Sequence, residues 1–181
     1  RTTADGRIVS MHNASVDSYT PDAAGPVAKF TLEQLKSMDI ASRISPEWRD
    51  ERVPELEEIL AVCAGKIGSY IDLKAADPCV VASALRPHHL EKRSVWYAGP
   101  GLLRKLKDCC PECLPMPDPL TPGGLGRLLD GGAPPVIATD FRTVTPEMVA
   151  ACHAAGALVF ADDGGPASWS ALLEMGVDGM Q

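Results

Sequence analysis

Between residues 67 and 181, short apolar segments alternate with amphipathic ones, and this alternation constrains the fold more than any other feature. Strands are predicted at "IGSYIDLK", "SVWY", "CLPM", "PVIAT", "ALVFAD" and "VDGM". Helices are predicted between them, at residues 78–85, 101–108, 122–130, 145–156 and 168–175. Strands that alternate with helices lie parallel and are joined by right-handed crossovers. The predicted fold class is therefore α/β.

The number of predicted strands bears on the architecture of the sheet. Six parallel strands fit either an open doubly wound sheet or most of a barrel, and two further strands upstream would complete a TIM-type (β/α)8 barrel. The chain starts at Arg1 beside a turn and stops at Gln181 within a predicted strand. We therefore expect residues 1–181 to be a single barrel domain that lacks its first two strands.

The N-terminal stretch "TADGRIVSMHN" has the pattern of a hairpin. The dipeptide Asp5-Gly6 favours a tight turn, because glycine tolerates the positive φ that such a turn requires. The strand "IVSMH" then carries His12 at its end. We expect the partner strand of this hairpin to lie upstream of the chain.

Residues 14–52 are polar and irregular, and are predicted to be an insertion on the larger scaffold. One helix is expected there, at "TLEQLKSM", with Thr31 as N-cap and Gln34 completing a capping box. The next helix, "PELEEILAVC", has Pro54 at a first-turn position and apolar residues at helical spacing.

Composition excludes several classes of partner. The net charge is -7 and the isoelectric point about 5.0, which argues against a nucleic-acid partner and against an anionic membrane surface. No apolar run approaches the ~20 residues of a transmembrane span. An acidic protein can still bind a phosphate if a divalent cation reverses the local field.

The six cysteines are interpreted mainly as packing residues. Cys63 and Cys152 fall on apolar helical faces, where a free cysteine behaves as a small hydrophobe. The stretch "CCPEC" contains one Cys-x-x-Cys pair, Cys110 and Cys113, without a second pair at zinc spacing. A local redox pair or simple packing is favoured over a metal site.

Three residues are candidates for chemistry, because parallel strands of a barrel direct their carboxyl ends to one catalytic face. They are His12, at the end of "IVSMH", and Asp72 and Lys74, near the end of "YIDLK". Residues two apart in a strand share a side, so Asp72 and Lys74 could hold a cation and an anionic phosphate together. The alternative is a structural ion pair.

The remaining histidines and one acidic turn are weaker candidates. His153 is expected to pack on its helix, and His88 and His89 to be solvated in a loop. The segment at residues 162–165, "DDGG", either contributes a ligand or turns the chain, and the turn is favoured.

The order of these motifs resembles the glycerophosphodiester phosphodiesterase family. The family's Thr-x-Asp-Gly turn, its strand ending in His-Asp and its Asp-x-x-Thr segment are similar to "TADGRIVSMHN" and "VDSYTPDAAGPV". Its later helices and strands are similar to "TLEQLKSMD", "PELEEIL", "IDLK" and "GVDGM". The similarity extends over the whole chain.

The resemblance implies a barrel enzyme that uses Ca²⁺ or Mg²⁺ to hydrolyse a small-molecule glycerophosphodiester to glycerol 3-phosphate and an alcohol. By position, His12 resembles one of the family's two acid/base histidines, Asp72 a metal ligand and Lys74 a phosphate contact. The family's second histidine and its Glu-x-Asp metal ligands would lie upstream of Arg1, so the chain alone is expected to be inactive.

Three departures from the family pattern keep other functions open. Asn13 stands where the family has Asp, Asp72 where it has Glu, and "FADDGG" where it has Trp-x-x-Asn. One alternative is a non-catalytic barrel that binds a ligand or has a structural role. Another is a lyase or phospholipase that acts on lipids, with "CLPMPDPL" as its apolar rim, although a proline-braced loop also explains that segment.

Overall fold

A computed structural model describes residues 1–162 and 164–181. The chain divides into two compact units. The first unit comprises Arg1–Ser69 and Leu73–Leu90, and the second comprises Tyr70–Asp72 and Glu91–Gln181. Each unit is described by itself.

The first unit opens with the predicted hairpin. Thr2 and Ile8 form an antiparallel bridge, and the Thr3 amide donates to the Arg7 carbonyl at 2.9 Å. Gly6 has a φ of 79°, the left-handed conformation that the turn requires. The prediction of the turn is thus confirmed, and the first residues of the chain pair with Ile8 and Val9. A partner strand that extends upstream of Arg1 stays a prediction.

The rest of the first unit consists of short helices joined by irregular segments. Its α-helices are α1 (Leu32–Ser37), α2 (Leu56–Cys63) and α3 (Pro78–Leu85), and its 3-10 helices are η1 (Val27–Lys29), η2 (Pro46–Trp48) and η3 (Arg86–His88). The capping box is present, with Thr31 Oγ1 accepting from the Gln34 amide and Gln34 Oε1 from the Thr31 amide. Pro54 lies outside α2, whose N-cap is Glu55. The hairpin, η1 and α1 contribute to one small core, which consists of Val9, Met11, Val16, Val27, Leu35, Met38 and Val53.

The strands form two sheets with parallel pairing. The sheet order β1-β2-β3 joins Ser69–Asp72, Ser94–Tyr97 and Leu114–Pro115, and the order β4-β5-β6 joins Val136–Asp140, Leu158–Asp162 and Gly179–Met180. All six predicted strand segments therefore contain a strand. The sheets are linked where the Ala138 amide donates to the Pro117 carbonyl at 3.0 Å. The α/β class is confirmed, and the eight-stranded barrel stays a prediction.

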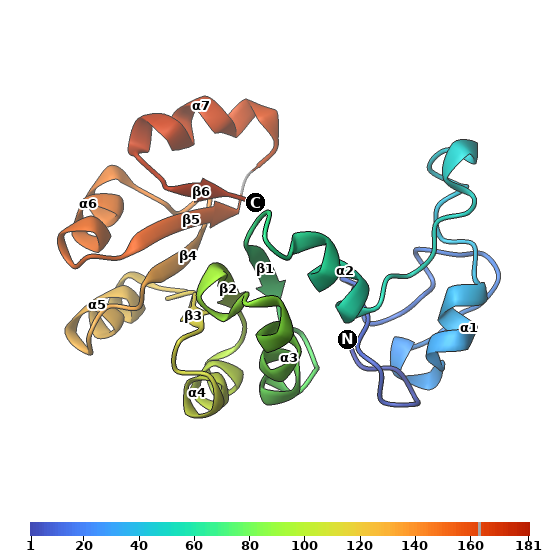
Figure 1. Ribbon diagram of the computed structural model, residues 1–181. Coiled ribbons are helices and arrows are strands. Elements are labelled where there is room, and N and C mark those ends of the chain that lie inside the picture. The colour runs from blue at the N-terminus through green and yellow to red at the C-terminus, as the bar shows by residue number, and fades with distance from the viewer. Residues whose placement is uncertain (163) are drawn as a thin grey trace. The chain divides into compact units, whose positions relative to one another are not determined.

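The helices of the second unit follow the strands in alternation (Figure 1). They are α4 (Pro100–Cys109), α5 (Pro122–Asp130), α6 (Pro146–Ala154) and α7 (Pro166–Met175), with the 3-10 helix η4 (Glu91–Arg93) before β2. α4 to α7 each have proline near their start, where its missing N–H costs no hydrogen bond. None of the described residues belongs to a helix long and apolar enough to cross a membrane.

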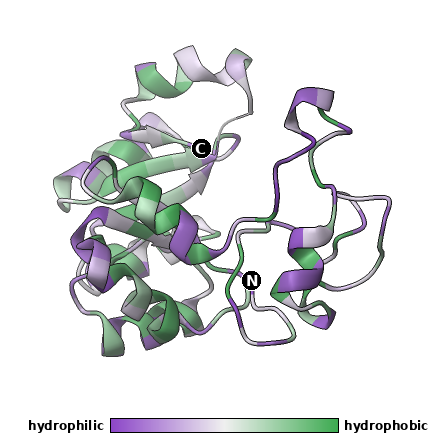
Figure 2. Cartoon of the chain, turned by 45° about the vertical axis from the view of Figure 1, so that its right-hand side comes forward, coloured by the Kyte–Doolittle hydropathy of each residue, from purple (hydrophilic) through white to green (hydrophobic). Residues whose placement is uncertain are grey.

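Successive side chains of a strand point to opposite faces of the sheet, so each face packs in a separate apolar cluster. On the outer face, Ile137, Val159 and Ala161 pack in one cluster with residues of α6 and α7. On the inner face, Met116, Val136 and Ala138 form a second cluster. In Figure 2 the strands of the second unit are mostly green, and the helices beside them carry both colours, as this arrangement requires.

The closing "GVDG" stretch is anchored by Asp178. Its carboxylate accepts hydrogen bonds from the Val159 amide and from His153 Nε2, both at 2.8 Å. Burial opposes ionisation of Asp178, but these hydrogen bonds outweigh it and lower the pKa of the carboxyl group. A Cβ at Gly179 would lie 2.8 Å from the Phe160 ring, so only glycine fits there. The expectation that His153 packs on its helix was wrong, since its side chain is 41% exposed and is paired with Asp178.

One prediction about a loop histidine was wrong, whereas the pairing of Cys110 with Cys113 is one of the alternatives that the sequence left open. His88 is not solvated: its side chain is 19% exposed and its Nε2 lies 3.3 Å from Glu57 Oε2. Cys110 and Cys113 form a disulfide in the buried part of the second unit, with Cα atoms 5.5 Å apart. Cys63 and Cys152 are free and buried, as expected.

Candidate functional site

In the second unit, aspartates follow the inner-face residues at the carboxyl ends of the strands. Residues two apart in a strand lie on the same face. Asp118 therefore follows Met116 on the inner face, as Asp140 follows Ala138 and Asp162 follows Phe160. Asp140 and Asp162 are register partners on β4 and β5. With Asp72 at the end of β1, these four aspartates are called the carboxylate rim.

The pKa values of Tyr97 and Tyr70 are affected by the negative charge of the carboxylate rim. Burial raises the pKa of Tyr97, and the carboxylates of Asp118 and Asp162 raise it further. Burial likewise raises the pKa of Tyr70, with Asp72 the next largest cause. A phenol resists ionisation among carboxylates because a second negative charge would be repelled. Rim carboxylates at separate strand ends therefore act on the same two phenols.

One rim carboxylate has its own counter-ion. Arg142 Nε donates to Asp140 Oδ1 at 2.9 Å and its Nη2 to Oδ2 at 2.6 Å, a bidentate geometry. These hydrogen bonds lower the pKa of Asp140 to about 2. Asp162 accepts instead from the Gln181 side-chain amide, a neutral donor.

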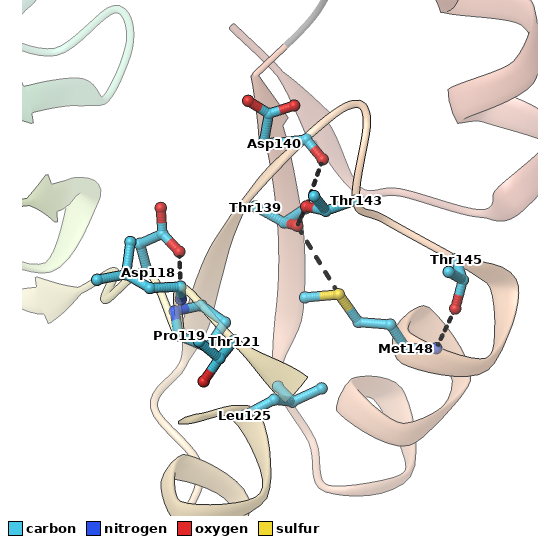
Figure 3. A pocket seen from close by; sticks show the side chains of 10 residues that line it. Asp118, Pro119, Thr121, Leu125, Thr139, Asp140, Thr143, Thr145 and Met148 are labelled. Carbon is cyan, nitrogen blue, oxygen red and sulfur yellow. Dashed lines mark hydrogen bonds between the residues drawn. The ribbon is translucent and has the colours of Figure 1, made fainter. Parts of the chain in front are cut away.

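Two cavities open beside the rim. The smaller, about 190 Å³, is lined by rim carboxylates, aromatic rings and neighbouring side chains: Tyr97, Met116, Asp118, Ala138, Thr139, Asp140, Phe160, Asp162 and Gln181. The larger, about 630 Å³, lies beside the starts of α5 and α6 (Figure 3). Both volumes belong to the second unit alone.

The predicted site residues fall in different units. Asp72 ends β1 in the second unit and is exposed, while His12 and Lys74 lie in the first unit and are also exposed. Lys74 lies in a bend beyond β1, so the strand that was expected to carry both residues ends at Asp72. A joint role of Asp72 and Lys74 stays a prediction. Within "DDGG", Asp162 ends β5, and the prediction for Asp163 lies outside the described residues.

His12 is oriented by its neighbour Asn13. His12 Nδ1 lies 3.0 Å from Asn13 Oδ1, and Asn13 Nδ2 donates to Ser18 Oγ at 2.8 Å. Because the amide nitrogen of Asn13 is committed to Ser18, its oxygen accepts from a protonated Nδ1. Nε2 is then the basic nitrogen of the neutral ring, suited to proton transfer.

Tyr97, Asp118 and Asp140 were missed by the sequence analysis. The available signal was an aspartate at the end of successive predicted strands, as in "VIATD" and "VFAD". One aspartate after a strand is also a common turn residue, so only the register distinguishes the two roles. Among the described residues, no group of three His, Cys, Asp or Glu side chains is close enough to hold a metal ion.

Comparison with known proteins identifies relatives of the chain. Residues 1–85 match the model of the glycerophosphoryl diester phosphodiesterase family. A putative glycerophosphodiester phosphodiesterase of Bacillus subtilis, YhdW, is 42% identical over 72 residues, which are 40% of this chain and 29% of that protein. Glycerophosphodiester phosphodiesterase GDPD4 of Arabidopsis thaliana is 24% identical over 190 residues, covering 97% of this chain and 57% of the relative. The chain thus matches less than two thirds of the length of each of these relatives.

Solved structures extend the similarity over the rest of the chain. A phosphodiesterase of Oleispira antarctica, solved with the product sn-glycerol-3-phosphate, matches 99% of this chain and 76% of its own, with a TM-score of 0.83 and 21% identity. At that identity the likeness establishes the fold. Residues 1–85 are therefore similar to the glycerophosphoryl diester phosphodiesterase family, and the fold seen in the Oleispira antarctica phosphodiesterase continues to the end of the chain.

Proposed function

We propose that the protein hydrolyses glycerophosphodiesters to glycerol 3-phosphate and an alcohol. The observation that carries this proposal is the family match over residues 1–85, the segment that contains His12, Asp72 and Lys74. The binding of sn-glycerol-3-phosphate by the Oleispira antarctica phosphodiesterase, which has the same fold, supports this class of ligand.

Each candidate residue has a role that suits its chemistry. His12, with Nδ1 held by Asn13, transfers a proton at Nε2 to or from the attacking or leaving oxygen. The ammonium group of Lys74 offsets the negative charge that grows on the phosphoryl oxygens. Asp72 supplies a carboxylate oxygen to a cation.

A divalent cation, Ca²⁺ or Mg²⁺, is part of the proposal. Carboxylate oxygens are the ligands that both ions prefer, and the carboxylate rim would repel a phosphate unless a cation were present. Asp72 would supply one carboxylate oxygen to such an ion, which in the case of Mg²⁺ commonly keeps several waters. The bound ion would polarise the phosphoryl oxygens of the substrate.

The test is the release of glycerol 3-phosphate from glycerophosphocholine by the full-length protein. We expect turnover with Ca²⁺ or Mg²⁺ that is lost with chelator. His12→Ala should lower kcat by about 10² to 10⁴, the usual contribution of a general acid or base. His89→Asn is the matched control, because His89 is an exposed histidine at a φ of 54°, a conformation that asparagine adopts readily.

The alternative, a non-catalytic barrel that binds a ligand, rests on Asn13 and "FADDGG". It makes the opposite prediction for the same experiment. If the folded, metal-loaded protein releases nothing from several glycerophosphodiesters, the enzymatic proposal is overturned. Unchanged activity in His12→Ala would overturn the role of His12 alone.

A further inference from the structure

The larger cavity of the second unit has the size of a binding site for an organic molecule. Its volume of about 630 Å³ lies within the range of about 300 to 1,000 Å³ typical of small-molecule sites. It is lined by Asp118, Pro119, Leu120, Thr121, Leu125, Thr139, Asp140, Thr143, Thr145 and Met148. These side chains come from the loop before α5, from α5, from the end of β4 and from the start of α6 (Figure 3).

The threonines of this cavity use their hydroxyl groups within the protein. Thr121 and Thr145 are N-caps that accept from the amides of Gly124 and Met148, at 3.0 and 3.2 Å. Thr143 Oγ1 donates to the Asp140 carbonyl at 3.1 Å. Thr139 Oγ1 lies 3.8 Å from the Met148 sulfur. Each of these hydroxyls therefore already has a partner within the protein, and the two N-cap hydroxyls keep their O–H hydrogen to donate.

The other side chains of the cavity wall are either apolar or, as in Asp140, already bound to a residue of the protein. Pro119, Leu120, Leu125 and Met148 offer hydrocarbon or thioether surface, and the Asp140 carboxylate is held by Arg142. A ligand group that enters this cavity therefore gains chiefly by burying apolar surface.

Leu120 lies on the cavity wall and is largely exposed to solvent. Its side chain is 82% exposed, and its backbone has a φ of 57°, which is uncommon for a bulky residue. The turn is held by Asp118, whose Oδ1 accepts from the Leu120 amide at 2.8 Å. Leu120 therefore adds exposed apolar surface to the wall of the cavity.

The two cavities share part of their lining. Asp118, Thr139 and Asp140 line both. A single ligand can therefore place a polar group at the carboxylate rim and an apolar group in the larger cavity.

We propose that the larger cavity binds the hydrocarbon chain of an amphiphilic phosphodiester, whose polar part lies at the carboxylate rim. The segment "CLPMPDPL", with Leu120 at its end, supplies the apolar lip of this site. The placement of the polar part rests on the proposed function, whereas the chain-binding cavity does not.

The test uses two phosphocholines that differ in their chains. Dodecylphosphocholine, kept below its micellar concentration, and glycerophosphocholine are titrated against the full-length protein by calorimetry and by methyl NMR. We expect dodecylphosphocholine to bind at least about tenfold more tightly, because its chain is removed from water. The Met148 methyl signal should shift with dodecylphosphocholine only.

Matched leucine variants locate the binding site. Leu120→Asn removes the apolar lip and keeps a residue that tolerates positive φ, and should weaken dodecylphosphocholine by about tenfold. Leu173→Asn changes a leucine on α7 that is 62% exposed and lies outside the lining, and should leave the affinity unchanged. Equal losses in the two variants would overturn the proposal.

The outcomes separate this proposal from the proposed function. Turnover of glycerophosphocholine without tighter binding of dodecylphosphocholine overturns the chain-binding cavity and leaves the phosphodiesterase intact. Tight binding with the Met148 shift, but without turnover of any glycerophosphodiester, supports the cavity and overturns the hydrolytic function.

Discussion

The two units of the chain are stabilised in different ways. The first unit has short helices and irregular segments, in which carboxylates and hydroxyls bind backbone amides, as Asp17 does for Gly25 and Asp39 for Ser42. The second unit repeats strand and helix around buried apolar clusters. The family model matches residues 1–85, almost entirely in the first unit, while at 21% identity the whole chain keeps the fold. An irregular segment needs particular residues, whereas a repeated β/α unit accepts many apolar combinations.

The largest effect on stability is expected in the core of the second unit. Ile137 is fully buried on β4, and Ile137→Ala should lower the free energy of unfolding by about 2 to 5 kcal/mol through lost burial and a cavity. Denaturant unfolding measures the change. Ile44→Ala removes an isoleucine side chain that is 72% exposed and should change stability by no more than about 0.5 kcal/mol. Similar losses in both variants would contradict the view that packing stabilises the second unit.

In the first unit, the corresponding test removes a hydroxyl group. Thr3 is 4% exposed, and its Oγ1 accepts from the Arg7 amide at 2.9 Å. Thr3→Val keeps the volume but leaves that amide without its acceptor, which should cost about 1 to 2 kcal/mol. Hydrogen exchange should show the loss around the hairpin, with unchanged protection on β4 and β5. A stabilised Thr3→Val would mean that burial, not polar satisfaction, dominates there.

The difference between the units also explains what the sequence could predict. Apolar residues at a period of 2 or 3.6 predicted the strands and helices of the second unit, and the dipeptide "DG" predicted the hairpin turn. These signals lie within a few neighbouring residues, so they can be recognised in the sequence. The carboxylate rim was only partly predicted, since Asp118 and Asp140 become neighbours of Asp162 only through strand register. The structural partner of His88, Glu57, is 31 residues away, so no local pattern indicates it.

Helix caps give a smaller, paired comparison. Thr31 caps α1 in the first unit and Thr145 caps α6 in the second, each accepting from the amide three residues later. Replacing either by alanine should cost about 1 kcal/mol. We expect Thr31→Ala to open α1 locally, because that helix has six residues and a single buried side chain, Leu35. Thr145→Ala should instead lower global stability, since α6 packs through Val149 and Cys152. Hydrogen exchange separates local from global opening.

Mild acid should produce the smallest and most local effect. Hydrogen bonds from Ser15 and the Gly25 amide lower the pKa of Asp17, and those from Ser42 lower the pKa of Asp39. Since both pKa values lie below the ordinary value of 3.8, the stabilisation is present above pH 3.8 and is lost as the pH falls further and the carboxylates protonate.

The measurement is the protection factor of backbone amides, corrected for the intrinsic exchange rate, as the pH is lowered from 5 to 2. Amides of Gly25 and Ser42, which donate to these carboxylates, should lose protection before the Ala138 amide, which donates to the Pro117 carbonyl. Asp17→Asn should abolish the pH dependence at Gly25 alone, because an amide oxygen accepts a hydrogen bond without titrating. Simultaneous loss at Gly25 and Ala138 would show that the two units open as one, and that the loops of the first unit do not depend on their own carboxylates.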